Sequence, residues 1–167
     1  MTPTVQFVRR LTALGPGDLS LLRGCASRPM HDCIEAFDLF TGLWWPLRRG
    51  PRVPGREASW LVAKLFPWNP STVEGGSLGD VLGQTAPRRR EDLLRERRRI
   101  DSLLRAQGRP LEACLRQAVC RLNRAGVALD WVQVLQDLTL WDRPWKPTQT
   151  KWARDWLQAM KGTRHAR

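Results

Sequence analysis

The sequence is poor in the residues that enzymes most often use to hold metals or to move protons. It contains only two histidines, His31 and His165. Its four cysteines follow none of the spacings that zinc sites use. The run His31-Asp32-Cys33 resembles a catalytic cluster on paper, but neighbours on a helix point about 100° apart and cannot converge on one substrate atom. The sequence therefore predicts a protein that is not an enzyme, with no catalytic residue, no metal site and no cofactor.

Long apolar runs and a phosphate-binding loop are missing as well. No stretch approaches the roughly 18 apolar residues that span a membrane, and the N-terminus lacks the apolar core and cleavage site of a signal peptide. We therefore expect a cytoplasmic protein that contacts no membrane and whose cysteines are reduced. The glycine-rich segment 75–79 lacks the lysine that a P-loop requires.

Acidic residues are few compared with basic ones. The chain has 28 Lys and Arg against 16 Asp and Glu, which gives a net charge of +12. Residues 88–167 hold 19 of the basic residues and 9 of the acidic ones. Such an excess points to a polyanionic partner, for which nucleic acid is the default candidate. We expect the binding surface to lie mainly on the C-terminal half.

Helical periodicity dominates the chain, and strand alternation is nearly absent. Between Pro110 and Gly126 the apolar residues recur at the spacing of one helix face. Asp130 and Ser77 are suited to cap the helices that follow them. The pattern predicts an all-α fold of two small helical bundles packed together, residues 1–87 and residues 88–167. The expected helices cover residues 4–14, 17–26, 31–40, 57–66, 77–82, 88–106, 110–126, 130–141 and a last segment from 148.

The tryptophans are expected to differ in role. Nine are present, and four of them recur at helical spacing on apolar faces, which is typical of core residues. This group comprises Trp131, Trp141, Trp152 and Trp156. Trp145 lies between Pro144 and Lys146 in a basic loop and is the better candidate for an exposed aromatic on which a base stacks. Asp137 and Asp155 fall within apolar helices, and we expect them to act as caps or ion-pair partners rather than as magnesium ligands.

Several segments, in the same order, resemble one family. The C-terminal segments are LEACLRQAVCRLNRAGVALDWVQVLQDLTLW followed by TKWARDWL. Upstream lie RRRIDSLLRA, GSLGDVL, ASWLVAKLFPW and the fainter LLRGCASRP. Together they resemble the CasB family, the small subunit of the type I-E CRISPR Cascade surveillance complex, over most of the chain.

The resemblance implies a non-catalytic subunit of two helical bundles that serves antiviral defence. Two copies would lie head to tail beside the backbone subunits, with the large subunit as a further partner. The nucleic-acid partners would be the crRNA, the target DNA and the displaced DNA strand. The subunit would stabilise the R-loop by supporting the guide–target duplex and by giving the displaced strand a basic path.

The resemblance also carries over to particular basic residues. These are Arg23 of LLRG, Arg99 and Arg105 of RRRIDSLLRA, Arg116 of LRQAV, and Arg143 with Lys146 after the Trp141 helix. Each would contact phosphate and release counterions. The full set of nucleic-acid-binding residues that we predict is Arg23, Arg28, Arg98, Arg99, Arg105, Arg109, Arg116, Arg121, Arg143 and Lys146.

Two other functions are compatible with a basic helical chain. One is a stand-alone nucleic-acid-binding module, such as an RNA chaperone or a transcription factor, with a helix-turn-helix over 111–141. Its second helix, 130–141, carries no Arg or Lys to read base edges, which weakens this alternative. The other is a structural adaptor that never touches nucleic acid, against which the charge of the C-terminal half argues.

Overall fold

The predicted all-α fold is confirmed. The computed structural model describes residues 1–165, and within them it contains helices joined by turns and no β-strand. The α-helices are α1 (Pro3–Thr12), α2 (Pro16–Arg23), α3 (Ile34–Trp44), α4 (Arg56–Leu65), α5 (Leu78–Gln84), α6 (Arg90–Arg105), α7 (Gly108–Arg124), α8 (Trp131–Thr139) and α9 (Pro147–His165). Three short 3-10 helices, η1 (Met30–Asp32), η2 (Trp45–Leu47) and η3 (Phe66–Trp68), lie between them.

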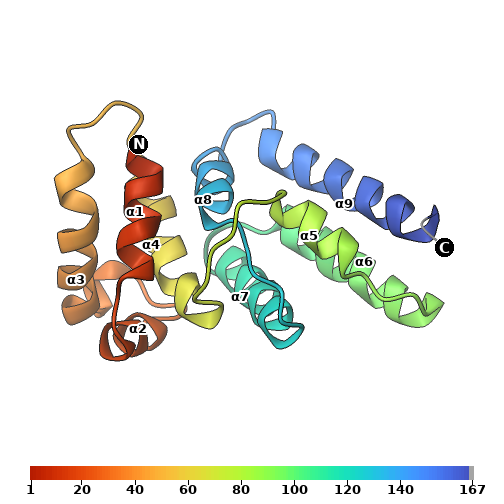
Figure 1. Cartoon of the computed structure of the whole chain (residues 1–167), viewed down its shortest axis with the longest axis horizontal. Coiled ribbons are helices and arrows are strands. Elements are labelled where there is room, and N and C mark those ends of the chain that lie inside the picture. Colours follow the sequence, from red (N-terminus) through yellow and green to blue (C-terminus); the bar gives the residue numbers. More distant parts are fainter. Residues whose placement is uncertain (166–167) are drawn as a thin grey trace.

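The helices lie along an elongated molecule (Figure 1). Helices α1 to α4 gather at one end, and α5, α6 and α9 lie at the other, with α7 and α8 between them. Helix α8 contacts both α1 and α4, whereas α7 contacts α4 and α6. The short helix α5 packs against α9, although it precedes residue 87 in the chain. None of the described helices combines the length and the apolar character needed to cross a membrane.

Local capping rules explain where several helices begin. The Ser77 hydroxyl accepts a hydrogen bond from the Asp80 amide at 3.2 Å, and the Asp130 carboxylate accepts one from the Gln133 amide at 2.9 Å. Both residues are therefore the N-caps that the sequence predicts. The helix expected over residues 31–40 instead begins at Ile34 and continues to Trp44, because residues 30–32 form the 3-10 turn η1 and Cys33, which follows, has a non-helical backbone.

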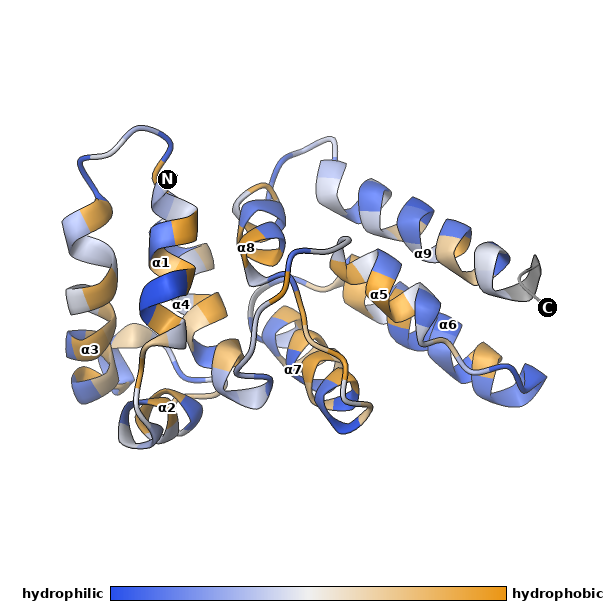
Figure 2. Ribbon diagram, viewed as in Figure 1, coloured by the Kyte–Doolittle hydropathy of each residue, from blue (hydrophilic) through white to orange (hydrophobic). Residues whose placement is uncertain are grey.

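One hydrophobic core runs through the molecule (Figure 2). At the N-terminal end, Phe40 makes edge-on contacts with Phe7 and Trp60 at centroid distances of 6.1 and 5.4 Å. At the other end, Trp141 and Trp152 lie 5.2 Å apart. The four tryptophans predicted to be core residues are all buried, which confirms that part of the sequence analysis.

The contact between α5 and α9 depends on two glycines. A Cβ atom added at Gly79 would lie 2.3 Å from the Trp152 carbonyl oxygen, and one at Gly83 would lie 2.6 Å from the Trp156 carbonyl oxygen. Any side chain at either position would therefore overlap the α9 backbone. The four-residue spacing places both glycines on the same side of α5, so this helix can lie directly on α9.

The two aspartates within apolar helices are bound by neighbouring side chains. The buried Asp137 carboxylate accepts hydrogen bonds from Trp152 Nε1 at 2.8 Å, Lys151 Nζ at 2.9 Å and Gln133 Nε2 at 2.9 Å. Asp155 accepts one from the Ser77 hydroxyl at 2.6 Å. Asp137 is thus an ion-pair partner, as predicted, and its contacts with Lys151 and Trp152 link α8 to α9.

Candidate nucleic-acid interface

The basic residues selected from the sequence do not form one patch. They lie in four places: along α6 and the groove beside α7, around Trp68, at a cavity between α4 and α7, and on the loop between α8 and α9. The helical face of a residue can be predicted from its position in the sequence. The neighbour that covers this face depends on how the helices pack.

The first place is the groove between α6 and α7. Arg98, Arg99 and Arg121 line a cavity of about 330 Å³ there. Arg121 pairs with the carboxylate of Glu96, and Arg99 approaches the same carboxylate at 3.5 Å. Because Glu96 is buried, these two arginines neutralise a carboxylate that the fold has removed from water. Part of the positive charge of Arg99 and Arg121 is therefore balanced within the protein and is less available to phosphate.

Other arginines nearby keep their charge available. Arg98 and Arg105 lie seven positions apart on α6 and therefore on one side of it. Arg109, at the start of α7, is exposed like these two. In the described part of the chain, no ion pair involves Arg98, Arg105 or Arg109. We call these three residues the α6–α7 arginines.

The second place is the ring of Trp68, which lies near two guanidinium groups. The Cζ atom of Arg23 lies 4.9 Å from the ring centroid, and that of Arg116 lies 6.0 Å from it. Arg23 also donates a hydrogen bond to the Pro67 carbonyl at 2.6 Å, and Arg116 donates one to the Ser27 hydroxyl at 3.1 Å. The two arginines thereby join α2, η3 and α7 by cation–π contacts and hydrogen bonds.

The third place is a cavity of about 520 Å³ between α4 and α7, lined by Arg28 and Arg109. A buried ion pair between Lys64 and Glu112 and the indole of Trp60 also line it. Lys64 donates a further hydrogen bond to the Arg28 carbonyl at 3.0 Å. The cavity is therefore lined both by exposed arginines and by a buried ion pair.

The fourth place is the loop between α8 and α9. The Arg143 guanidinium lies 5.9 Å from the centroid of the Trp145 ring, and 69% of Trp145 is exposed. The expected exposure of this tryptophan is confirmed. Lys146, the next residue, is half-buried and has a left-handed backbone with φ of 49°.

The sequence analysis missed one basic segment, the loop between α3 and α4. It contains Arg48, Arg49 and Arg52 beside Trp45, which is 51% exposed. The available signal was the run WWPLRRGPR, in which aromatic and basic residues are interleaved. The charge balance of the two halves does not indicate this segment, because most of the excess charge lies after residue 87.

The run His31-Asp32-Cys33 does not converge on one point. His31 and Asp32 are exposed, with His31 Nε2 3.5 Å from Asp32 Oδ1, whereas Cys33 is buried. Among the described residues, no group of three or more His, Cys, Asp or Glu side chains is placed to hold a metal ion. The chemistry that the arrangement offers is the binding of anions by guanidinium groups.

Comparisons with known proteins identify the family. No curated protein matches the chain. The model of the family "CRISPR-associated protein Cse2" matches residues 18–156. CasB from Thermus thermophilus is 27% identical with a TM-score of 0.72, covering 95% of this chain and 100% of that one. M. ruber CasB is 26% identical with a TM-score of 0.72, covering 96% and 94%.

A third solved structure, CasB from Thermobifida fusca, is 18% identical with a TM-score of 0.69 over 92% of this chain and 94% of that one, and it shares the fold. The family model covers most of the chain, and the two more similar structures agree with it over nearly their full lengths. The chain therefore belongs to the Cse2 (CasB) family of CRISPR-associated proteins, the small subunits of Cascade.

Proposed function

We propose that this chain is the non-catalytic small subunit of a type I-E Cascade complex and that it binds nucleic acid through the α6–α7 arginines. The observation that carries the proposal is that Arg98, Arg105 and Arg109 are exposed and that no ion pair within the described residues involves them. Each can therefore neutralise a phosphate and release its counterions.

This mode of binding suits a complex in which another molecule reads the sequence. Phosphate contacts fix position and carry no base information, whereas pairing between guide and target supplies specificity. A small subunit with exposed arginines would support the guide–target duplex and hold the displaced strand, and so stabilise the R-loop. The backbone subunits, the large subunit and a second copy of the chain are the protein partners in this proposal.

A sequence-reading helix-turn-helix protein is disfavoured by the position of α8. That helix would have to enter the major groove, yet it packs against α1 and α4 and contains no Arg or Lys.

The first experiment measures binding by the purified chain. We expect its affinity for labelled DNA to be similar across unrelated sequences, and we expect the DNA to stay intact when magnesium is added. A strong preference for one sequence would favour the alternative, a stand-alone DNA-binding protein that recognises a base sequence. Magnesium-dependent nicking by the purified chain would contradict the non-catalytic role.

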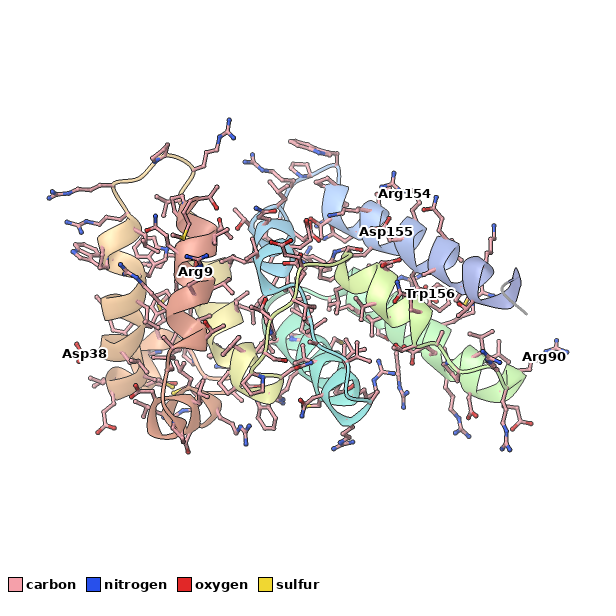
Figure 3. The ribbon with its side chains drawn as sticks, in the orientation of Figure 1. Arg9, Asp38, Arg90, Arg154, Asp155 and Trp156 are labelled. Atoms are coloured by element: carbon pink, nitrogen blue, oxygen red, sulfur yellow. The ribbon has the colours of Figure 1, made fainter. Side chains whose placement is uncertain are left out.

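The second experiment uses the assembled complex. A variant with Arg98→Gln, Arg105→Gln and Arg109→Gln should still allow guide RNA loading but should shorten the lifetime of the R-loop. A matched control removes the same charge elsewhere, with Arg9→Gln, Arg154→Gln and Lys161→Gln on α1 and α9. Arg9 and Arg154 lie away from α6, on the outer surface (Figure 3). Equal effects of the two triple variants would refute the assignment.

A further inference from the structure

Two tryptophans among the described residues are largely exposed, one in the α3–α4 loop and one in the α8–α9 loop. These two loops lie along the same edge of the molecule (Figure 1). Trp45 is 51% exposed and Trp145 is 69% exposed. The loops come near each other at Gly55, because a Cβ atom added there would lie 3.9 Å from the Thr139 methyl group at the end of α8. Exposed tryptophans are candidates for binding, because Trp is enriched at interfaces.

Each exposed indole has a guanidinium against its ring. Arg48 Cζ lies 3.9 Å from the centroid of Trp45, and Arg143 Cζ lies 5.9 Å from that of Trp145. A guanidinium can lie over only one face of a ring at a time. Between residues 45 and 56 the chain carries Arg48, Arg49, Arg52 and Arg56 and no acidic residue. The edge is therefore both aromatic and strongly positive.

The backbone of both loops is unusual as well. Arg52 and Lys146 have φ angles of 57° and 49°, in the left-handed region that favours glycine. Both positions carry a long basic side chain instead. Non-glycine residues in this region tend to occur where the local geometry serves binding. A third such residue among those described, Ser27, lies outside these loops, so two of the three fall in the loops that carry the exposed tryptophans.

We propose that Trp45 and Trp145 form a stacking site for the bases of a single-stranded nucleic acid. The proposal rests on the nucleic-acid-binding function proposed above and deepens it. Every base has a π face, so stacking on indoles tolerates any sequence, while Arg48, Arg52 and Lys146 are placed to neutralise the adjoining phosphates. In a duplex the bases already stack on one another, so this edge selects unpaired strand.

The test compares two probes with the full-length protein: an oligonucleotide of thymidines and an abasic oligonucleotide of the same length. Both carry the same phosphates, and only the first has bases. We expect the wild type to prefer the thymidine probe. Trp45→Ala and Trp145→Ala should each weaken its binding about tenfold, because stacking on one aromatic contributes about 1 to 3 kcal/mol and 1.4 kcal/mol is a factor of ten.

The abasic probe should bind to both variants as it does to the wild type. Trp45→Phe and Trp145→Phe keep an aromatic ring and should restore most of the preference. Ile34→Ala, which removes another exposed apolar side chain, at 77% exposure on α3, should change neither probe. Thermal melting of each variant establishes that the fold is retained.

Three results would overturn the inference. If the wild type binds neither probe, the proposed function itself fails. If the wild type binds both probes equally and the double variant Trp45→Ala/Trp145→Ala does so too, nucleic-acid binding stands but stacking is wrong. If the double variant keeps the preference for bases but no longer assembles with the other subunits, the edge is a protein interface instead.

Discussion

Lys64 and Glu112 form an ion pair with a Nζ–Oε1 distance of 2.8 Å and side-chain exposures of only 6% and 7%. Lys64 belongs to α4 and Glu112 to α7, so the pair joins the N-terminal helices to the C-terminal ones. A buried pair gains little over two apolar residues, but losing one partner leaves an uncompensated charge away from water.

Glu112→Gln should therefore lower the free energy of unfolding by about 3 to 5 kcal/mol, as removal of one partner of a buried pair does. Urea denaturation of the wild type and the variant measures this loss in the free energy of unfolding. The matched control is Glu57→Gln, because Glu57 pairs with Arg56 at 3.7 Å but is 77% exposed, and such pairs contribute about 0 to 1 kcal/mol. The double variant Lys64→Met/Glu112→Leu should be more stable than Glu112→Gln. Equal losses at positions 112 and 57 would contradict this account.

Gly79→Ala should destabilise the protein, because the added methyl group meets the α9 backbone and cannot be accommodated by a rotamer change. We expect a loss of about 1 to 3 kcal/mol. Gly42→Ala is the control. Gly42 lies within α3 with open space around it, so the same substitution should stabilise by about 0.5 to 1 kcal/mol. Melting temperatures that move in the same direction for both variants would refute the close packing of α5 on α9.

Trp156→Ala should cost about 3 to 5 kcal/mol, since a large buried aromatic leaves a cavity. Trp156 is 3% exposed and faces α5 from α9 (Figure 3). Its neighbour Leu157 is 41% exposed, and Leu157→Ala should cost less than about 1 kcal/mol. If Trp156→Ala left the melting temperature unchanged while nucleic-acid affinity collapsed, Trp156 would be a stacking residue rather than part of the core.

The Cys25 thiol should make the protein sensitive to alkaline pH. Burial raises the pKa of Cys25 from 9.0 to about 12, and its neighbour Cys33 raises it as well. The unfolded thiol loses its proton near 9, whereas the folded one keeps it, so stability falls as pH rises from 9 towards 12. Melting temperatures between pH 8 and about 10.5 should fall less steeply for Cys25→Ala than for the wild type. Parallel curves for the two proteins would contradict the pKa shift.

Local rules predicted much of the fold from the sequence. Ser77 and Asp130 were identifiable as N-caps because a cap needs only a short polar side chain before an apolar periodic segment. The buried tryptophans were identifiable from their helical spacing. Pro29 and the 3-10 turn that follows it shifted the start of α3 to Ile34, because such a turn leaves no distinct periodicity.

The candidate site was harder to predict because it depends on tertiary contacts. Glu96 lies in a highly charged stretch, so the sequence predicts a surface residue. In the structure α7 packs onto α6, which buries Glu96 and places its carboxylate against Arg121. The contact of Arg23 and Arg116 with Trp68 joins residues far apart in the chain. Whether an arginine is free for phosphate depends on such neighbours, which periodicity does not reveal.

The salt dependence of binding tests the central claim most directly. Each phosphate neutralised on a single strand contributes about 0.7 to the slope of log affinity against log salt concentration. Replacing Arg98, Arg105 and Arg109 by Gln should therefore make the slope less negative by about 2. The control triple variant of Arg9, Arg154 and Lys161, with the same loss of charge, should keep the wild-type slope. An unchanged slope in the α6–α7 variant would contradict the proposal that these arginines contact nucleic acid.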